Sequence, residues 1–246
     1  MSNFADEVKE RTGENMNNVR LVDTAHEFLV ESAKARYSYN FHWLGRPIIQ
    51  YPQDIVAMQE LIWTIKPDLI VETGVAHGGS LIFYASMLEL NAICGGPTEA
   101  SVIGIDIDIR EHNKHAIIEH PMARRIMLVE GSSTDPDVVD IVQNQVGLRQ
   151  RVMVCLDSNH THQHVLEELS IYAPMTSVGS YCVVFDTLIE QMPDDTYSDR
   201  PWGRGNNPLS AIDEFRLKNF DFEVDRSIDG RLLISVAPGG FLKRIS

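Results

Sequence analysis

Short apolar runs alternate with amphipathic stretches along most of this chain. Each run is rich in β-branched residues and lies between turn-forming residues, a pattern typical of buried strands. The runs predict strands at 69–73, 102–107, 126–130, 152–157, 181–186, 222–225 and 231–236. Between the first five strands, the periodicity predicts helices at 79–90, 111–119, 135–146 and 161–171, the third with an N-cap at Ser133 or Thr134.

The alternation predicts a parallel sheet, because successive parallel strands are joined by right-handed helical crossovers. After the fifth strand come a long loop, a helix at 208–219 and the last two short strands. Asp229-Gly230 lies between those two strands, and Asp-Gly is a strong tight-turn signal, so we expect an antiparallel hairpin there. The expected fold class is α/β, a Rossmann-like sheet of seven mostly parallel strands with helices on both faces and a C-terminal antiparallel hairpin.

Residues 1–66 precede the first strand of this sheet. Segments 24–36 and 54–65 have helical, amphipathic patterns, and prolines interrupt the connection between them. We therefore divide the chain into an N-terminal helical cap or extension, 1–66, and a cofactor-binding domain, 67–246. The extension is expected to cover an edge of the sheet or to form a subunit contact in a homo-oligomer.

The composition narrows the class of protein. With 246 residues and 43% hydrophobic content, the chain can bury one sizeable core. Its net charge of −14 has the wrong sign for a nucleic-acid binder. Two of its three cysteines, Cys155 and Cys182, fall inside strand-like runs, which favours reduced thiols and a cytoplasmic location. No apolar run is long enough to span a bilayer, and the first residues show no leader pattern.

A glycine-rich turn follows the strand that ends near Glu72, in the order E-T-G-V-A-H-G-G-S. We expect Gly74, Gly78 and Gly79 to let the backbone approach a ligand, and Ser80 to begin a helix with free N–H groups. The spacing is not that of a dinucleotide fingerprint, and an acid here would repel a pyrophosphate. Glu72 suits the α-ammonium of S-adenosylmethionine (SAM). The alternatives to a SAM site are a site for another nucleotide and a strand-to-helix turn that binds no ligand.

The next two strands end in polar residues at the same edge of the sheet. Asp106 follows the second strand and is predicted to accept hydrogen bonds from a ribose, with Asp108 as the backup. The interval from Glu72 is long, and a loop insertion at 91–100 accounts for it. Ser132 and Ser133 follow the third strand, where a serine can bind an adenine edge. The alternative roles are helix capping for all of them and solvent exposure for Asp106.

Two further strand ends deliver the groups for a reaction, Asp157 and His160 after the fourth strand and Asp186 after the fifth. Carboxylates suit a hard divalent cation such as Mg²⁺, so Asp157 and Asp186 are the candidate metal ligands. His160 is a suitable base for a hydroxyl proton. Asp157 could alternatively cap a helix. A zinc site with His162 and His164 is disfavoured, because residues two apart at a helix start point apart.

The long segment 191–208 is expected to be a lid or binding loop. Trp202 could stack on the apolar face of a sugar, while Arg200, Asn206 and Asn207 could supply polar contacts. The alternative is a well-ordered structural loop without a ligand.

Together these segments resemble the family that groups cephalosporin hydroxylases with rhamnosyl O-methyltransferases. The shared motifs are E-x-G-x-x-x-G-G-S at 72–80, I-G-I-D-x-D at 103–108, D-x-x-H at 157–160, V-V-x-D at 183–186 and R-P-W-G-x-G-N-N-P at 200–208. The resemblance implies a class I methyltransferase fold, with 67–246 as the SAM-binding methyltransferase domain. It also implies metal-ligand positions at Asp157 and Asp186 and a catalytic base at His160. Relatives often carry an acid where this chain has Phe185.

The leading hypothesis is a SAM-dependent O-methyltransferase that modifies a sugar hydroxyl of a small-molecule or glycan acceptor, assisted by Mg²⁺. Two alternatives come from other classes. One is a metal-dependent hydroxylase or oxygenase component, which the family name suggests. The other is a non-catalytic SAM-binding partner module, which the absent acid at Phe185 suggests.

Overall fold

The computed structural model describes residues 3–246, and its centre is a sheet of seven strands within that range. The strands are β3 Leu69–Thr73, β4 Ser101–Asp106, β5 Ile126–Glu130, β6 Val152–Leu156, β7 Tyr181–Val184, β8 Phe222–Val224 and β9 Phe241–Arg244. Their spatial order is β5-β4-β3-β6-β7-β9-β8. The first five are parallel, and β9 runs antiparallel between β7 and β8. The expected α/β fold class is confirmed.

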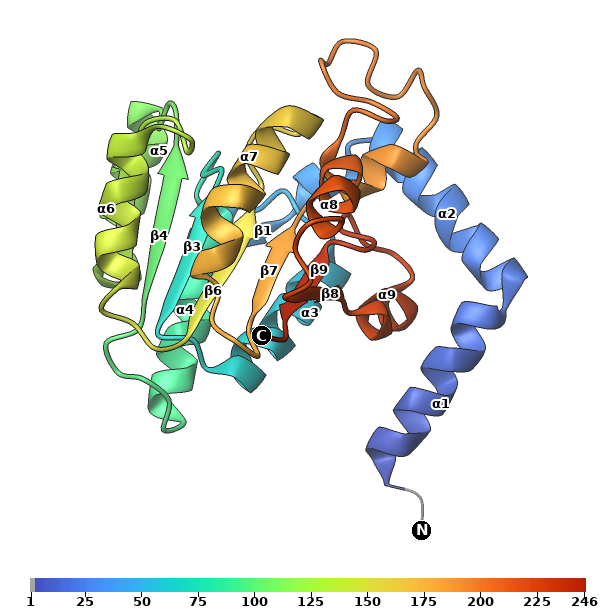
Figure 1. Ribbon diagram of the computed structural model, residues 1–246, viewed down its shortest axis with the longest axis horizontal. Coiled ribbons are helices and arrows are strands. Elements are labelled where there is room, and N and C mark those ends of the chain that lie inside the picture. Colours follow the sequence, from blue (N-terminus) through green and yellow to red (C-terminus); the bar gives the residue numbers. More distant parts are fainter. Residues whose placement is uncertain (1–2) are drawn as a thin grey trace.

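Helices cover both faces of the sheet, as Figure 1 shows. They are α3 Pro52–Ile65, α4 Gly79–Ile93, α5 Glu111–Ile118, α6 Pro136–Val146, α7 His162–Tyr172, α8 Pro208–Arg216 and α9 Arg226–Leu232. Because successive side chains of a strand point to opposite faces of the sheet, β3 contributes residues to two hydrophobic cores. Ile70 packs with residues of α3 and α4, whereas Val71 packs with residues of α6, α7 and α8. The first turn of α6 is capped by Asp135 and not by Ser133 or Thr134.

The N-terminal region has two parts. The helices α1 Phe4–Asn17 and α2 Val19–Lys34 form an arm beside the body, on the right of Figure 1. Then a short hairpin, β1 His42–Trp43 and β2 Arg46–Pro47, returns to the sheet. Helix α3 packs its buried Met58 and Ile62 into the sheet core, so this helix is more than a cap. The division at residue 66 stays a prediction.

The predicted strand 231–236 is wrong. Helix α9 ends at Leu232, residues 233–236 form neither helix nor strand, and the last strand lies later, at β9. The side chain of Asp225 caps α9 by accepting a hydrogen bond from the N–H of Ser227, and Gly230 packs against Met16 of α1. The Asp-Gly pair is thus inside a helix, where long-range packing overrides its turn tendency. The antiparallel pairing of the last two strands is confirmed, but through a longer connection.

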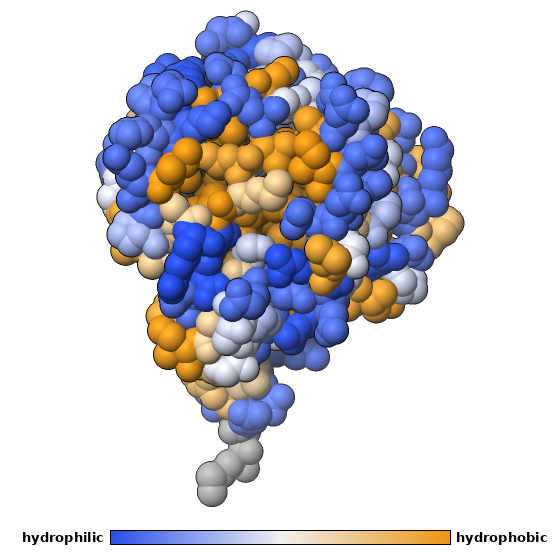
Figure 2. Space-filling view, turned by 90° about the vertical axis from the view of Figure 1, so that its left-hand side faces the viewer, coloured by the Kyte–Doolittle hydropathy of each residue, from blue (hydrophilic) through white to orange (hydrophobic). Residues whose placement is uncertain are grey.

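Exposed apolar side chains lie at one edge of the sheet. Strand β5 is an edge strand, and the apolar side chains of Ile118, Met127 and Ile141 are exposed on α5, β5 and α6. Figure 2 shows apolar side chains gathered on this side of the molecule. Across residues 3–246, the structure contains no helix with the length and apolar character needed to cross a bilayer.

Candidate active site

The carboxyl ends of β3, β4, β6 and β7 open into one cavity of about 580 Å³. Parallel strands place their ends at the same edge, which is where open α/β sheets bind ligands. The residues of this edge that line the cavity include Gly74, Gly79, Ser80, Asp106, Ser132, Ser133, Asp157, His160, Asp186 and Trp202. Most of the predicted site residues are therefore brought together in one place.

The glycine turn is shaped by its contacts with the rest of the protein. Gly74 has a φ of +93°, and a Cβ there would lie 2.0 Å from the carbonyl oxygen of Asp157. A Cβ on Gly79 would lie 2.1 Å from the carbonyl oxygen of Pro47. Both glycines also line the cavity, whereas Gly78 packs against Ile117 and does not. The sequence predicts that these glycines let a ligand come close to the backbone. In the structure, Gly74 and Gly79 already lie close to other backbone atoms of the protein.

Glu72 lies beneath the turn and does not line the cavity. It is fully buried, because β3 is a central strand covered on both faces. The hydroxyl of Ser80 donates a hydrogen bond of 2.8 Å to Oε2 of Glu72. Burial raises the pKa of the Glu72 carboxyl to about 8. The observed contact of Glu72 holds the start of α4, and its predicted contact with a ligand stays a prediction.

Asp106 joins the end of β4 to the glycine turn and lines the cavity. Its Oδ2 accepts hydrogen bonds from the N–H groups of Val75 at 2.8 Å and Ala76 at 3.2 Å. Its Oδ1 accepts from the N–H of Asp108 at 3.2 Å and, like any carboxylate oxygen, has capacity for a second donor. Asp108 itself is exposed and does not line the cavity.

Ser132 and Ser133 form another wall of the cavity with His164. The hydroxyl of Ser133 lies 3.2 Å from Nε2 of His164, and Oε1 of the buried Glu168 lies 3.3 Å from the same nitrogen. The hydrogen bond with Glu168 raises the pKa of His164. The sequence interpretation weighs His164 only as a zinc ligand. The i, i+4 spacing of His164 and Glu168 on one helix is the signal that indicates their contact.

Asp157, His160 and Asp186 converge at the reactive end of the cavity. One ligand atom from each lies within 4.8 Å of the others, and Nε2 of His160 is 3.2 Å from Oδ2 of Asp186. Loss of contact with water, and then the nearby Asp186 charge, raise the pKa of Asp157 well above its usual range.

This donor set fits a divalent cation. Two carboxylates at close range repel each other, and a cation held by Asp157 and Asp186 would remove that repulsion. Phe185 is buried in the core beneath the site and offers no ligand atom.

The other histidines of the H-x-H-x-H run point elsewhere. Nδ1 of His162 lies 2.9 Å from the hydroxyl of Ser210, and its Nε2 lies 3.1 Å from Glu214, both on α8. His164 faces Ser133 on the other side of α7. The prediction that the two imidazoles point apart is confirmed.

The loop between β7 and α8 brings one of its predicted substrate residues to the cavity. The Trp202 ring lies edge-on to the His160 ring, with centroids 4.8 Å apart, and the guanidinium of Arg200 lies 5.4 Å from the Trp202 ring centre. Arg200 is exposed and does not line the cavity in this arrangement.

Asn206 and Asn207 form hydrogen bonds that hold the loop to its neighbouring helices. Asn206 accepts a hydrogen bond from the N–H of His162 at 3.0 Å. Asn207 is fully buried, caps the first turn of α8 and donates to Glu190. Neither amide lines the cavity. Their observed contacts are those of a well-ordered structural loop, the alternative to a binding loop. Whether they also affect an acceptor stays a prediction.

One wall of the cavity was missed entirely by the sequence interpretation. It comes from the N-terminal region, and its residues are Tyr39, Pro47, Ile48, Ile49 and Gln50. Arg46 fastens this wall to the glycine turn by donating two hydrogen bonds to the carbonyl oxygen of His77, at 3.0 and 2.6 Å. No local pattern marks such a wall, because it depends on contact between segments about 30 residues apart.

Comparison with known sequences gives consistent matches. Residues 35–245 match the family model described as rhamnosyl O-methyltransferase/CmcI. The rhamnosyl O-methyltransferase of Mycobacterium tuberculosis is 31% identical over 197 residues, which cover 78% of this chain and 73% of that protein. The rhamnosyl O-methyltransferase of Mycobacterium leprae is 27% identical over 207 residues, 82% of each protein.

Solved structures share the fold. A structure of CmcI with Mg and SAM aligns with a TM-score of 0.58 at 19% identity, covering 85% of this chain and 78% of that one. The O-methyltransferase TomG from Streptomyces achromogenes, involved in tomaymycin synthesis and in complex with SAM, aligns with a TM-score of 0.54 at 14% identity. That alignment covers 90% of each chain.

Proposed function

The chain belongs to the rhamnosyl O-methyltransferase/CmcI family, and from this premise we propose that it is a SAM-dependent O-methyltransferase acting on a sugar hydroxyl. One observation supports the proposal above the others. The glycine turn, Asp106 and the group Asp157, His160 and Asp186 all border a single cavity. A methyl donor and an acceptor hydroxyl need such adjacent sites, because the transfer is a direct displacement.

SAM would lie along the strand ends. The ribose hydroxyls would donate to Asp106, and the adenine edge would meet Ser132 and Ser133. These three residues border the cavity on the side of β4 and β5, whereas His160 and Asp186 border it on the side of β6 and β7. The methyl group would then face His160.

The chemistry follows from the weakness of a neutral hydroxyl as a nucleophile. His160 takes the hydroxyl proton as the oxygen attacks the methyl carbon, and the carbon–sulfur bond breaks with its electron pair going to sulfur. Asp186, 3.2 Å from Nε2, stabilises the imidazolium that forms. A Mg²⁺ ion held by Asp157 and Asp186 would lower the pKa of the hydroxyl and orient it.

The acceptor is proposed to be a small molecule or glycan that presents a sugar. Trp202 lines the cavity beside His160, and its indole ring would offer an apolar surface on which a sugar can stack. Arg200, whose guanidinium lies 5.4 Å from the centre of that ring, could reach a polar group of the same acceptor. The cytoplasmic location and self-association that the sequence suggests stay proposals, and light scattering of the purified protein tests the second.

Calorimetric titration with S-adenosylhomocysteine (SAH), with and without Mg²⁺, tests the cofactor and the metal. Methyl transfer from labelled SAM to rhamnosyl glycosides then tests the reaction. We expect His160→Ala to lower turnover by about 10² to 10⁴ while SAH binding is retained, which is the usual contribution of a general base. His115→Ala, at an exposed histidine on α5, is the matched control. Normal turnover in the His160 variant would remove it from the mechanism.

One observation favours a second candidate, a non-catalytic SAM-binding module. Phe185 is buried where relatives often carry an acid, and within residues 3–246 the candidate metal group offers two carboxylates, Asp157 and Asp186. Tight SAH binding with no transfer to any glycoside and no response to Mg²⁺ would support this candidate. Oxygen consumption without SAM, measured on the same sample, would instead support the hydroxylase alternative.

A further inference from the structure

Gln50 is an unusual residue of the cavity wall. Its side chain is only 2% exposed, and it lines the cavity. Among residues 3–246, neither its Nε2 nor its Oε1 has a hydrogen-bond partner. Buried amides are nearly always paired, because an unpaired donor or acceptor loses its bonds to water without replacement. A cavity residue in this condition is suited to a ligand that supplies the missing partners.

The position of Gln50 is set by the start of α4. The carbonyl oxygen of Pro47 and the Cα of Ile48 lie so close to Gly79 that no Cβ fits between them. Arg46 holds the same segment to the carbonyl of His77. Gln50 follows two residues after Ile48, so its backbone is anchored beside the glycine turn and the first turn of α4.

The amino-acid end of SAM carries one ammonium and one carboxylate. Among residues 3–246, Oε1 of Glu72 has no hydrogen-bond partner, but Glu72 does not line the cavity. The Ser80 hydroxyl donates to Glu72. Glu72 is buried away from the cavity, and burial raises its pKa to about 8, so its carboxyl is mostly uncharged at neutral pH. The free N–H groups of the first turn of α4 can meet a carboxylate, but they cannot accept from an ammonium.

We propose that Gln50 binds the methionine end of SAM, with Nε2 donating to the α-carboxylate and Oε1 accepting from the α-ammonium. A primary amide offers one donor group and one acceptor side by side, and this pair matches a zwitterion. The inference rests on the proposed function, since it takes SAM as the cofactor. It assigns recognition of the amino-acid end to the N-terminal wall of the cavity.

The test compares two ligands by calorimetric titration. SAH carries the amino-acid end, and 5′-methylthioadenosine lacks it. Gln50→Met has a similar length and no polar atoms, and we expect it to weaken SAH binding about tenfold to hundredfold, the range for hydrogen bonds to charged groups. Binding of 5′-methylthioadenosine should stay within about twofold, since its contacts lie elsewhere. Gln143→Met, at an exposed position on α6, is the matched control.

The melting temperature of the ligand-free variant gives a second readout. Gln50→Met removes two unpaired buried groups, so it should leave the melting temperature unchanged or raise it. A residue with a purely structural role would lower it. Gln50→Asn keeps the amide but withdraws it by one methylene, and it should weaken SAH binding with less effect on packing.

Each outcome is distinct. Unchanged SAH binding in Gln50→Met, or an equal loss for both ligands, overturns the inference while leaving the proposed function standing. A wild-type protein that binds neither SAH nor SAM overturns the proposed function itself. Selective loss of SAH affinity in Gln50→Met and Gln50→Asn, with normal folding, supports the assignment.

Discussion

At the scale of single side chains, the environment of Asp157 is that of a candidate metal ligand. Its carboxylate is surrounded by other acids, of which Asp186 has the largest effect, followed by Glu72. An arrangement of like charges costs stability unless a cation or a proton joins it. Such a cluster beside the imidazole of His160 is what a metal-assisted proton transfer requires.

Glu72 leads to a prediction about pH. Burial raises its pKa from 4.5 to about 8, so the folded protein keeps a proton that the unfolded chain releases between these values. The free energy of unfolding should therefore fall as the pH rises from about 5 to 8, by on the order of 5 kcal/mol at most, and then level off. In Glu72→Gln this fall should be much smaller, as measured by denaturant unfolding at several pH values.

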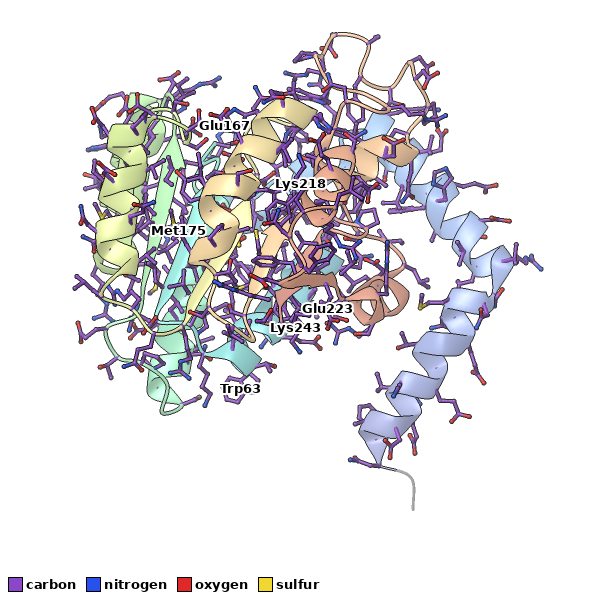
Figure 3. All side chains as sticks on the ribbon, viewed as in Figure 1. Trp63, Glu167, Met175, Lys218, Glu223 and Lys243 are labelled. Carbon is purple, nitrogen blue, oxygen red and sulfur yellow. The ribbon has the colours of Figure 1, made fainter. Side chains whose placement is uncertain are left out.

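The control for this experiment is Glu167→Gln, an exposed position on α7 that is labelled in Figure 3. Burial also raises the pKa of Asp54, to about 7, and it contributes a fall of the same sign in every variant. Only the difference between the profiles is therefore informative. Parallel profiles for wild type and Glu72→Gln would contradict the raised pKa.

At the scale of elements, the contact between β2 and α4 connects the N-terminal region to the cofactor pocket. A side chain at residue 79 would clash with the N-terminal region, because a Cβ there would lie 2.1 Å from the Pro47 carbonyl oxygen. The same contact places the wall residues that border the cavity. The packing of β2 against α4 therefore also determines the shape of the cavity.

We predict that Gly79→Ala destabilises the protein by about 1 to 3 kcal/mol, the usual cost of overpacking, and weakens SAH binding. The new methyl group must push the Pro47 segment away from α4. Thermal unfolding and calorimetry measure the two effects. Gly147→Ala is the matched control, because a Cβ at the end of α6 would make only an ordinary contact of 3.5 Å. Equal stability of the two variants would contradict the close contact.

At the scale of the whole molecule, the N-terminal region divides by its relation to the cavity. None of the residues of α1, as described here, is buried, and this helix contacts α9 near Met16. Residues 39–50 instead contribute a wall of the cavity. The arm and the wall should therefore respond differently to truncation.

Removal of residues 1–17 is expected to lower the melting temperature slightly and to leave SAH affinity within about twofold, because no residue of α1, 4–17, is buried. Removal of residues 1–50 should abolish SAH binding, since it also deletes Gln50 and the segment packed on Gly79. Calorimetry on both truncated proteins measures the effect. Loss of binding in the shorter truncation would show that the arm shapes the site, directly or through a second subunit.

Much of the architecture follows from the sequence alone. The positions of β3 to β7 could be predicted because buried parallel strands are continuous apolar runs, which local composition reveals. The convergence of Asp106, Asp157 and Asp186 could also be predicted, because the carboxyl ends of parallel strands share one edge of the sheet. Both conclusions rest on rules that hold whatever the distant parts of the chain do.

Only the tertiary structure decided which neighbour each polar side chain meets. It buried Glu72 beneath the turn, made a helix of Asp229 and Gly230, used Asn207 as a cap and placed Gln50 in the cavity wall. Local periodicity predicts the secondary structure of a segment. The role of a polar residue depends instead on the segments, distant in the sequence, that pack against it. These long-range contacts leave no signal in the residues beside it, so they could be seen only once the chain was folded.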